Sequence, residues 1–444
     1  MPAHSRTDRP SAAPGEGAVD ATATPTDPGK QSRVASHIPV VAAFDGYRAY
    51  AILGVVMLHL LGQSGVLAAA GSNWFGQLIL GTLGQSVDIL FIISGFVVFL
   101  PTVARHGEFG SVSSYAVRRA ARLVPAYWAV LVIVLVLISL VTVDPPIPFP
   151  ALGSIPVHAA FLQVPVAMFH GLALGFGADG PLWTMSLEVT FYLILPFVAA
   201  WYFRRPFVGL LIAAAITVMW HEALIHWSTT QAVLGDRALT RAAYMQFPFF
   251  AFSFGAGMTG AWAYVRLRER YRPEQVARHL GWVQLVSLIS LAVFCYVVGD
   301  TGKGLVGARS SPIIALGFTG SLATLMVATA LGPMRWQRPF AHPFARWLGD
   351  ISYGMYLIHF VIITYAVRLL FTPSTGLPGV AQGDGSFGTF VALAALVLPL
   401  TVLYGYISGR YLEQPIRRWA QRFGRRQQER AAGTRATDAV RTDG

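Results

Sequence analysis

The sequence contains ten apolar stretches, each of roughly 17–25 residues and therefore long enough to cross a lipid bilayer as a helix. Only 12% of its residues are charged, whereas a soluble domain carries about 25%. The chain is therefore predicted to fold as an all-α, polytopic membrane protein with about ten transmembrane helices. The expected spans are residues 48–66, 78–100, 123–142, 184–203, 206–222, 244–265, 280–298, 311–331, 347–370 and 388–410.

A further apolar stretch, residues 156–176, is interrupted by prolines and glycines. Non-helical backbone at membrane depth is tolerated only where it is buried in protein or lines a water-filled cavity. We therefore expect this stretch to form a re-entrant or surface segment on the outer side of the membrane.

Arginines are distributed unevenly among the loops, and this distribution predicts the orientation. The net charge of +12 comes almost wholly from arginine, because the chain has only two lysines. The arginine-rich loops are 101–122, 204–205, 266–279 and 332–346, and the loops without arginine or lysine are 67–77, 143–183 and 371–387. Because positive residues concentrate in cytoplasmic loops, we expect an even number of spans, both termini in the cytoplasm and a location in the cell membrane. The same bias explains the basic charge without a nucleic-acid partner.

The two ends of the chain differ from its apolar middle. Residues 1–40 are rich in small and polar residues and lack hydrophobic periodicity, which predicts a disordered tail. Residues 41–416 form the expected transmembrane domain, and residues 417–444 form a basic, cytoplasmic C-terminal tail. Cys295 is the only cysteine, so no intrachain disulfide or cysteine zinc site is expected, and we expect no metal.

Two histidines lie well inside predicted spans, where an ionisable side chain is unfavourable unless it has a partner. His59 follows Arg48 by eleven residues, so a helix that enters from the cytoplasm places it about 16 Å deep. His359, twelve residues beyond Trp347, reaches a similar depth on the ninth span. The two imidazoles either bond to neighbouring helices as core residues or line one shared cavity.

A carboxylate lies inside the second span, in the sequence "GQSVDILFIISGFVVFL". Asp88 is followed by Ser94 two turns further toward the cytoplasm. An isolated carboxylate is unfavourable at this depth, so we expect Asp88 to meet an arginine, a histidine or a helix N-terminus. A structural pairing and a catalytic role both fit this pattern.

A second carboxylate lies about one turn inside the fourth span, in "PLWTMSLEVTFYLILPF". Part of the signal around Glu188 is ordinary helix initiation, because a proline and hydroxyl residues precede it. With Trp183 and Tyr192 nearby, the same carboxylate also suits a sugar-like acceptor that approaches from the outer side.

An arginine cluster precedes the third span, in "SYAVRRAARLVPAYW". Arg119 and Arg122 are three residues apart and share one helix face, and Arg118 is adjacent. Two guanidiniums on one face suit phosphate groups, although anchoring to lipid headgroups produces the same pattern. Asp45 lies one turn before Arg48 at the same cytoplasmic mouth.

These residues suit transfer of an acyl group. The sequence has no Gly-rich phosphate loop, no HExxH motif and no nucleophile elbow. A histidine can act as general base for a hydroxyl that attacks a thioester, or form a transient acyl adduct. A neighbouring carboxylate would hold the tautomer of that histidine. The pattern supports a phosphate-rich donor at the cytoplasmic mouth and His59 midway across the membrane.

Six segments resemble, in the same order, segments of the acyltransferase 3 family of integral membrane acyltransferases. They are "FDGYRAYAILGVVMLH", "SVDILFIISGF", "YAVRRAARLVPAYW", "LWTMSLEVTFYLILP", "LGDISYGMYLIH" and "LEQPIRRW". The resemblance covers roughly Phe44 to Trp419. The signature of this family, an arginine followed after ten residues by a histidine, is matched by Arg48 and His59, and its second arginine pair is matched by Arg119 and Arg122.

The resemblance implies a ten-helix enzyme that takes an acetyl or another short acyl group from acyl-CoA and passes it to a hydroxyl of a glycan, glycolipid or macrolide. Acyl-CoA is then a co-substrate, and no tightly bound cofactor is expected. His59 is implied as the catalytic group, with the arginines helping to hold the donor. The candidates are His59, Arg48, Asp45 and Glu188 for catalysis, Arg119, Arg122 and Arg118 for donor binding, and Asp88, Ser94, His359, Tyr192 and Trp183 as supporting residues.

The competing hypothesis is a proton-coupled transporter or flippase that uses His59, Asp88 and His359 as a proton relay. The arginines at the cytoplasmic mouth and the lack of inverted repeats in the sequence favour the enzyme. The residues do not choose between an envelope glycan, a glycolipid and a macrolide as acceptor.

Overall fold

The computed structural model describes residues 41–66, 74–170, 174–234, 237–300, 312–370, 374–377, 380–382 and 385–424. The predicted disordered tail, residues 1–40, lies outside the described residues, as does most of the predicted basic tail. The helices described below belong to one compact unit, which comprises Ile38–Gly444.

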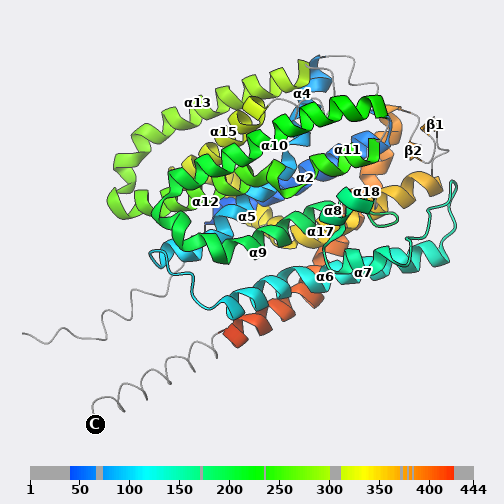
Figure 1. The fold of residues 1–444 in the computed structure, drawn as a ribbon, viewed down its shortest axis with the longest axis horizontal. Helices are drawn as coiled ribbons and strands as arrows, with labels where there is room; N and C mark the ends of the chain where they lie inside the picture. Colours follow the sequence, from blue (N-terminus) through cyan, green and yellow to red (C-terminus); the bar gives the residue numbers. More distant parts are fainter. Residues whose placement is uncertain are drawn as a thin grey trace, which may run out of the picture. The chain divides into compact units, whose positions relative to one another are not determined.

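Long helices make up almost all of the described structure (Figure 1). They are α2 (Ala42–Gln63), α5 (Ser86–Ala104), α6 (Val112–Leu140), α9 (Trp183–Arg204), α10 (Pro206–Leu234), α12 (Phe247–Arg270), α13 (Pro273–Asp300), α15 (Pro312–Leu331), α17 (Pro343–Leu370) and α18 (Phe387–Ile407). The shorter helices are α4 (Trp74–Gly84), α7 (Ser154–Ala159), α8 (Gln163–His170), α11 (Arg237–Tyr244), α16 (Met334–Ala341) and the π-helix η1 (Ser408–Glu413).

Within the described residues, nine helical stretches are long and apolar enough to cross a membrane, as expected for a multi-pass membrane protein. The expected span at residues 244–265 is occupied by α12, which is not one of the nine. This helix has the required length, but glycines, a tryptophan and a tyrosine replace aliphatic residues along it and lower its mean hydropathy. Helix α6 begins at Val112, well before the predicted start at residue 123, so the arginine cluster lies on the same continuous helix as the span.

The expected span at residues 78–100 is broken into two helices. Helix α4 ends at Gly84, α5 begins at Ser86, and Gln85 between them is not helical. Glycine and serine are weak helix formers, because glycine loses backbone entropy and serine competes for backbone hydrogen bonds. The break places Asp88 in the first turn of α5, where the helix dipole favours a carboxylate. Of the three partners expected for Asp88, an arginine, a histidine or a helix N-terminus, the structure shows the third, the N-terminus of its own helix.

The segment at residues 156–176 forms no span in its described part, which contains most of α7 and all of α8. The loop between α17 and α18 contains two short strands, β1 (Ser374–Leu377) and β2 (Val380–Gln382), which pair in antiparallel fashion. These strands are the departure from the all-α prediction within the described residues.

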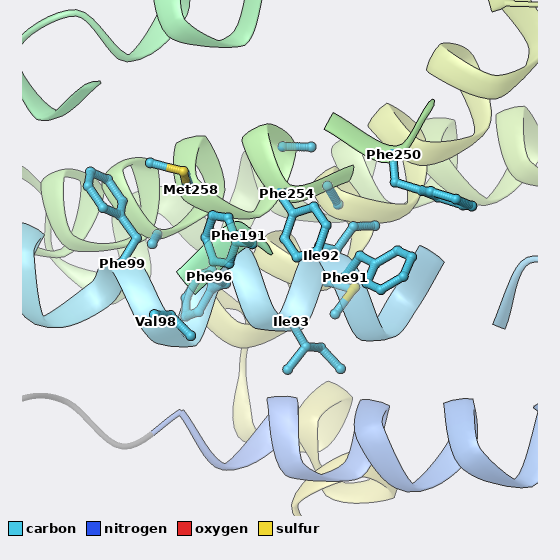
Figure 2. Packing of buried hydrophobic residues seen from close by; sticks show 14 of the residues in the cluster. Phe91, Ile92, Ile93, Phe96, Val98, Phe99, Phe191, Phe250, Phe254 and Met258 are labelled. Atoms are coloured by element: carbon cyan, nitrogen blue, oxygen red, sulfur yellow. The ribbon is translucent and has the colours of Figure 1, made fainter. Parts of the chain in front are cut away.

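Helices α5 and α12 pack extensively against each other. A Cβ atom on Gly95 would meet the backbone carbonyl of Phe254, and one on Gly257 would meet that of Ile92. Small residues of this kind let membrane helices approach closely. Figure 2 shows the aromatic side chains that fill this contact, with the rings of Phe254 and Phe91 side by side at 4.9 Å between centroids. This part of the molecule is an apolar core.

Helices α2 and α17 form a second extensive contact, and both carry a histidine. Near their N-terminal ends, Gly349 of α17 packs against the backbone carbonyl of Asp45 in α2. Further along, His59 meets His359, so the two helices run in the same direction. Of the nine apolar helical stretches, α17 is the most deeply buried and α13 the least. Helix α17 is therefore surrounded by protein, and it positions the residues described next.

Candidate active site

The two in-span histidines lie in direct contact. His59 Nδ1 is 3.0 Å from His359 Nε2, and the ring centroids are 5.1 Å apart. The prediction that both imidazoles reach one level is confirmed, although 300 positions separate them in the sequence. His359 is fully buried, whereas His59 keeps part of its surface accessible. The ring of Phe360 covers one side of His59, at 5.0 Å between centroids.

The hydrogen bonds around this pair assign the tautomers of the two imidazoles. His359 Nδ1 lies 2.6 Å from the backbone carbonyl oxygen of Tyr356, which can only accept, so His359 carries its proton on Nδ1. In a neutral imidazole Nε2 is then an acceptor, and it receives the Nδ1–H of His59. This assignment, made from the network, leaves Nε2 of His59 with a free lone pair, the form that a general base or a nucleophile needs.

A cavity of about 60 Å³, which we call the inner cavity, lies next to this chain of hydrogen bonds. Helices α2, α5, α6, α9 and α17 contribute its lining residues, which are Arg48, Ile52, Val87, Leu90, Phe91, Ile93, Ser94, Arg122, Thr184, Met185, Glu188, Ser352, Tyr353 and Tyr356. A cavity of this volume has room for more than one water molecule. Tyr356 connects the two features, because it lines the cavity and its carbonyl oxygen holds His359.

Glu188 is fixed in the inner cavity by two hydroxyl groups. Ser94 Oγ donates to Glu188 Oε1 over 2.9 Å, and the hydroxyl of Tyr192 donates to the same oxygen over 2.5 Å. Arg48 and Arg122 line the same cavity. Two guanidiniums against one carboxylate give the inner cavity a positive balance of charge, which suits an anionic ligand or a polarised carbonyl group.

Asp45 lies away from the histidine pair. Its carboxylate forms ion pairs with Arg48 at 3.5 Å and with Arg346 at 3.8 Å. Fourteen positions separate Asp45 from His59, about 21 Å along a helix that rises 1.5 Å per residue. The carboxylate that we expected to hold the tautomer of His59 is therefore not Asp45, and the group that contacts Nδ1 of His59 is an imidazole, that of His359.

A larger cavity of about 250 Å³, which we call the vestibule, lies at the start of α6. Its lining residues are Val98, Pro101, Thr102, Arg105, Phe109, Tyr115, Arg118, Arg119, Gln421 and Gly424. Arg105 is held by hydrogen bonds from its guanidinium to the backbone carbonyls of Glu108 and Phe109, at 3.0 and 2.6 Å. Burial lowers the pKa of Arg105, but an arginine keeps its charge in proteins. Three guanidiniums and two aromatic rings thus surround the vestibule.

Arg119 connects the vestibule with the inner cavity. Its guanidinium carbon is 5.7 Å from the ring centroid of Tyr115, which lines the vestibule, and 5.4 Å from that of Tyr192, which bonds Glu188. The buried Nε of Arg119 has no hydrogen-bond partner among the described residues. A buried donor without a partner points to a bound group outside the protein chain. Arg122 lies one turn further along α6 and lines the inner cavity.

Two of the predicted supporting residues lie elsewhere. Asp88 accepts a hydrogen bond of 2.9 Å from Ser253 Oγ and lines a separate cavity of about 20 Å³. Trp183 packs against Phe250, at 5.7 Å between ring centroids. The structure therefore places Ser94 at the inner cavity, whereas Asp88 and Trp183 lie in the neighbouring core. The α4–α5 break directs Asp88 toward α12.

Sequence reasoning missed the polar partners that α17 brings to the site. The hydroxyls of Tyr356 and Thr184 are 2.7 Å apart, and Tyr356 also donates to the backbone carbonyl of Pro181 over 3.1 Å. Tyr356 precedes His359 by three positions, which places both on one helix face. That spacing was the available signal in the sequence. It does not reveal that His359 bonds the backbone carbonyl of Tyr356 and not its phenol group.

Another buried carboxylate lies between α8 and α9, outside the membrane-spanning helices. Asp179 is fully buried, and neither of its carboxylate oxygens has a hydrogen-bond partner among the described residues. Burial raises the pKa of Asp179 well above its usual range. The sequence around it, "FGADGP", is typical of a turn and gives no sign that this aspartate is buried.

The geometry narrows the class of protein. A helical membrane bundle that holds an unprotonated imidazole nitrogen near a cationic cavity has the groups needed to transfer an activated group within the membrane. A family model described as "Acyltransferase domain" matches residues 41–407, which include nearly all of the bundle. The chain therefore carries an acyltransferase domain, and it belongs to the acyltransferase 3 family.

The curated relatives of the chain are distant in sequence. The chain is 25% identical over 392 residues to a peptidoglycan O-acetyltransferase of Listeria monocytogenes, with 85% of this chain and 56% of the relative covered. It is 25% identical over 394 residues to a putative peptidoglycan O-acetyltransferase of Bacillus subtilis, with 86% and 55% covered. The chain spans about half the length of the curated relatives it matches. No solved structure matches it.

Proposed function

We propose that this protein is an O-acyltransferase of the cell membrane that moves an acetyl or another short acyl group from acyl-CoA to a hydroxyl of a sugar-containing acceptor. A cell-envelope glycan is the favoured acceptor, because two relatives carry peptidoglycan O-acetylation in their names. Glycolipids and macrolides offer the same hydroxyl chemistry. The observation that carries the proposal is the hydrogen-bond chain from Tyr356 through His359 to His59, which leaves one basic nitrogen free.

The arrangement of arginines supports a long, phosphate-bearing donor. Arg118 and Arg119 line the vestibule, and Arg122 lines the inner cavity one helical turn further along α6. Guanidiniums bind phosphate oxygens through paired, charge-assisted hydrogen bonds, so the vestibule suits the nucleotide end of CoA. The inner cavity then takes the pantetheine arm. Arg48 and His59 are about 16 Å apart along α2, a distance that an extended pantetheine arm can cover.

His59 supplies the chemistry of the transfer in this proposal. Nε2 of His59 accepts the proton of the acceptor hydroxyl while the hydroxyl oxygen attacks the thioester carbonyl. The new C–O bond forms, the C–S bond breaks, and the CoA sulfur leaves with the proton that His59 accepted. His359 Nε2 accepts a hydrogen bond from Nδ1–H of His59, and this bond stabilises the transient imidazolium of His59. The cationic groups of the inner cavity polarise the donor.

Orientation follows from the arginine bias. The vestibule and Arg48 belong to the end of the bundle whose loops are rich in arginine, and the positive-inside rule directs such loops to the cytoplasm. Acyl-CoA is a cytoplasmic compound, so this orientation presents the vestibule to the donor. Both termini are then cytoplasmic. The acceptor reaches His59 from the opposite end.

The proposed function is tested with His59→Ala in membrane vesicles supplied with labelled acetyl-CoA and glycan fragments as acceptor. We expect labelled acyl transfer to fall by about 10²- to 10⁴-fold, the contribution of a general base. His279→Ala is the matched control, because His279 is exposed on α13 and its loss should leave transfer unchanged. Full transfer by His59→Ala would refute the assignment of the catalytic group.

The competing hypothesis of a proton relay is not favoured by the geometry. A relay requires Asp88 to be in line with the two histidines. Asp88 instead bonds Ser253 in a separate cavity, and Nδ1 of His359 ends at a backbone carbonyl that cannot accept a transferred proton. The same two observations agree with an enzyme in which the histidine pair acts alone.

A further inference from the structure

The last apolar helix is interrupted by a π-helix. Helix α18 ends at Ile407, η1 covers Ser408–Glu413, and residues 414–424 are helical again. The acyltransferase domain match ends at residue 407, so η1 and the helix after it lie beyond the matched region. π-Helical turns are rare and are frequent at functional sites. The contacts that η1 makes with the rest of the protein are therefore of interest.

Glu413, the last residue of η1, points into the protein. It is 2% exposed, and its carboxylate accepts a hydrogen bond of 3.1 Å from Ser408 Oγ within the same π-helix. Arg417 forms an ion pair with it at 3.8 Å, and the backbone N–H of Gly354 in α17 also donates to it. Such partners offset the cost of burying a carboxylate. Glu413 thus joins α17 to the helix that follows η1.

Helix α17 packs closely against η1 and the end of α18. A Cβ on Gly354 would lie 3.0 Å from Cβ of Ser408 and 3.1 Å from Cα of Gly405. A side chain on Gly354 would therefore require η1 to shift by a few tenths of an ångström. Glu413 also lies within electrostatic range of Arg122, which lines the inner cavity. The π-helix is therefore tied both to the core and to the proposed donor site.

The helix after η1 reaches the vestibule. The apolar helix including its continuation runs from Phe387 to Gly424, 38 residues or about 57 Å at 1.5 Å per residue, which exceeds the roughly 30 Å of a hydrocarbon core. Its end therefore projects beyond the membrane, and it runs beside the start of α6, as the red and cyan helices of Figure 1 show. A Cβ on Gly424 would lie 3.0 Å from Nη1 of Arg118, and Gln421 lines the vestibule.

We propose that residues 414–424 form a wall of the donor-binding vestibule, with Gln421 facing the phosphate-bearing nucleotide end of the donor. Glu413 is the positioning residue of this wall: it acts through its bonds to Ser408, Arg417 and Gly354 and does not touch the donor. The inference rests on the proposed function, because it assigns the vestibule to acyl-CoA. It adds a binding segment beyond residue 407, where the match to the acyltransferase domain ends, and this segment includes part of the sixth family-like stretch, "LEQPIRRW".

The rotation of the helix explains why η1 is needed. Each residue turns an α-helix by about 100°, since 3.6 residues make one turn. A wider π-helical turn therefore changes which face of the following helix points to α6. With η1 present, Gln421 and Gly424 both line the vestibule beside Arg118.

The first test changes the charge at Gln421 and measures CoA binding to the purified full-length protein by calorimetry. If a phosphate of CoA lies near Gln421, we expect Gln421→Lys to bind CoA more tightly than the wild type and Gln421→Glu to bind it more weakly. Each change should be roughly two- to fivefold, as for an exposed ion pair. Arg422→Gln is the matched control, because Arg422 is exposed on the same helix and does not line the vestibule. Equal affinities of the two Gln421 variants would overturn the proposal.

The second test separates positioning from simple electrostatics. Glu413→Gln makes the site more positive, so a purely electrostatic role predicts tighter CoA binding. A displaced wall predicts weaker CoA binding, which is the result we expect, with an unchanged KM for the acceptor. Tighter or unchanged CoA binding by Glu413→Gln would refute its positioning role. If this variant does not fold, the Gln421 pair still decides the proposal.

The same measurements distinguish failure of the inference from failure of the proposed function. If the wild-type protein binds no CoA, the donor assignment itself is wrong. If the wild type binds CoA and the two Gln421 variants bind it with the same affinity, the donor assignment stands, but the proposal that residues 414–424 form a wall of the vestibule is wrong.

Discussion

Glu188 and Asp88 lie in two neighbouring regions, and each accepts a hydrogen bond of 2.9 Å from a serine hydroxyl. The cavities beside them differ. The inner cavity measures about 60 Å³ and is also lined by Arg48 and Arg122, whereas the cavity beside Asp88 measures about 20 Å³. Among the described residues that line the smaller cavity, Asp88 is the only one with a charge. A serine hydroxyl and a helix N-terminus suit a structural carboxylate, whereas guanidiniums beside free volume indicate a ligand.

The largest effect is expected at the histidine pair, which Tyr356 links to the inner cavity. His359→Leu removes the acceptor for the Nδ1–H of His59, so His59 loses both its assigned tautomer and the partner of its imidazolium. We expect labelled acyl transfer to fall by about 10²- to 10⁴-fold, the range of general-base catalysis. Steady-state kinetics in membrane vesicles measure this change.

His359→Gln is the matched comparison, because the amide oxygen of glutamine can accept the same hydrogen bond. We expect this variant to keep clearly more activity than His359→Leu at equal expression and melting temperature. Equal loss in both variants would mean that His359 contributes packing alone, and the distinction between the inner cavity and the cavity of Asp88 would be weaker.

Depth along a helix was enough to predict that the two histidines reach one level, because each residue adds a fixed rise, but it left open whether they touch. The arithmetic placed His59 and His359 at one level on helices that are far apart in the sequence, and they are 3.0 Å apart. It did not predict the tautomers. These depend on the carbonyl of Tyr356, and backbone direction around a side chain is not encoded in hydrophobic periodicity.

Breaks in helices were harder to predict than helices. The apolar pattern of the second span continues through Gln85, so periodicity gave one helix where the structure has two. The π-helix at Ser408–Glu413 is also invisible in the pattern, and it lies against Gly354 of another helix. Each feature decides where a carboxylate points, Asp88 after the break and Glu413 in the π-helix.

The second prediction tests the two carboxylates directly. Glu188→Gln removes the carboxylate that lines the inner cavity together with Arg48 and Arg122, so we expect acyl transfer to fall by about ten- to a hundredfold, or roughly 1.4–2.8 kcal/mol. Asp88→Asn keeps an oxygen that accepts from Ser253, so we expect nearly wild-type transfer. Initial rates at saturating acyl-CoA measure both.

The reverse result would contradict the comparison. If Asp88→Asn lost more activity than Glu188→Gln, with both proteins folded, Asp88 would be a functional residue and the small cavity would be part of a path for the substrate or a proton. The Ser94→Ala variant sharpens the test, since it removes one of the two hydroxyls bonded to Glu188 and should have an intermediate effect.

The smallest expected effect concerns Asp179, a buried carboxylate whose oxygens have no hydrogen-bond partner among the described residues. Burial raises the pKa of Asp179 in the folded protein, so the folded state binds a proton more tightly than the unfolded state. Stability therefore falls as pH rises from the unfolded pKa, about 3.9, through the raised folded pKa. Each unit of difference corresponds to about 1.4 kcal/mol.

Asp179→Asn removes this pH dependence, because asparagine stays neutral. We expect the variant to be more stable than the wild type at pH 7 and to converge with it near pH 4, in melting curves of the detergent-solubilised protein. Asp144→Asn is the control, since Asp144 is exposed in a loop and its replacement should not change the difference between the two pH values. A variant less stable than the wild type at pH 7 would show that Asp179 is ionised and paired in the folded protein, and would add a third charged region to the comparison.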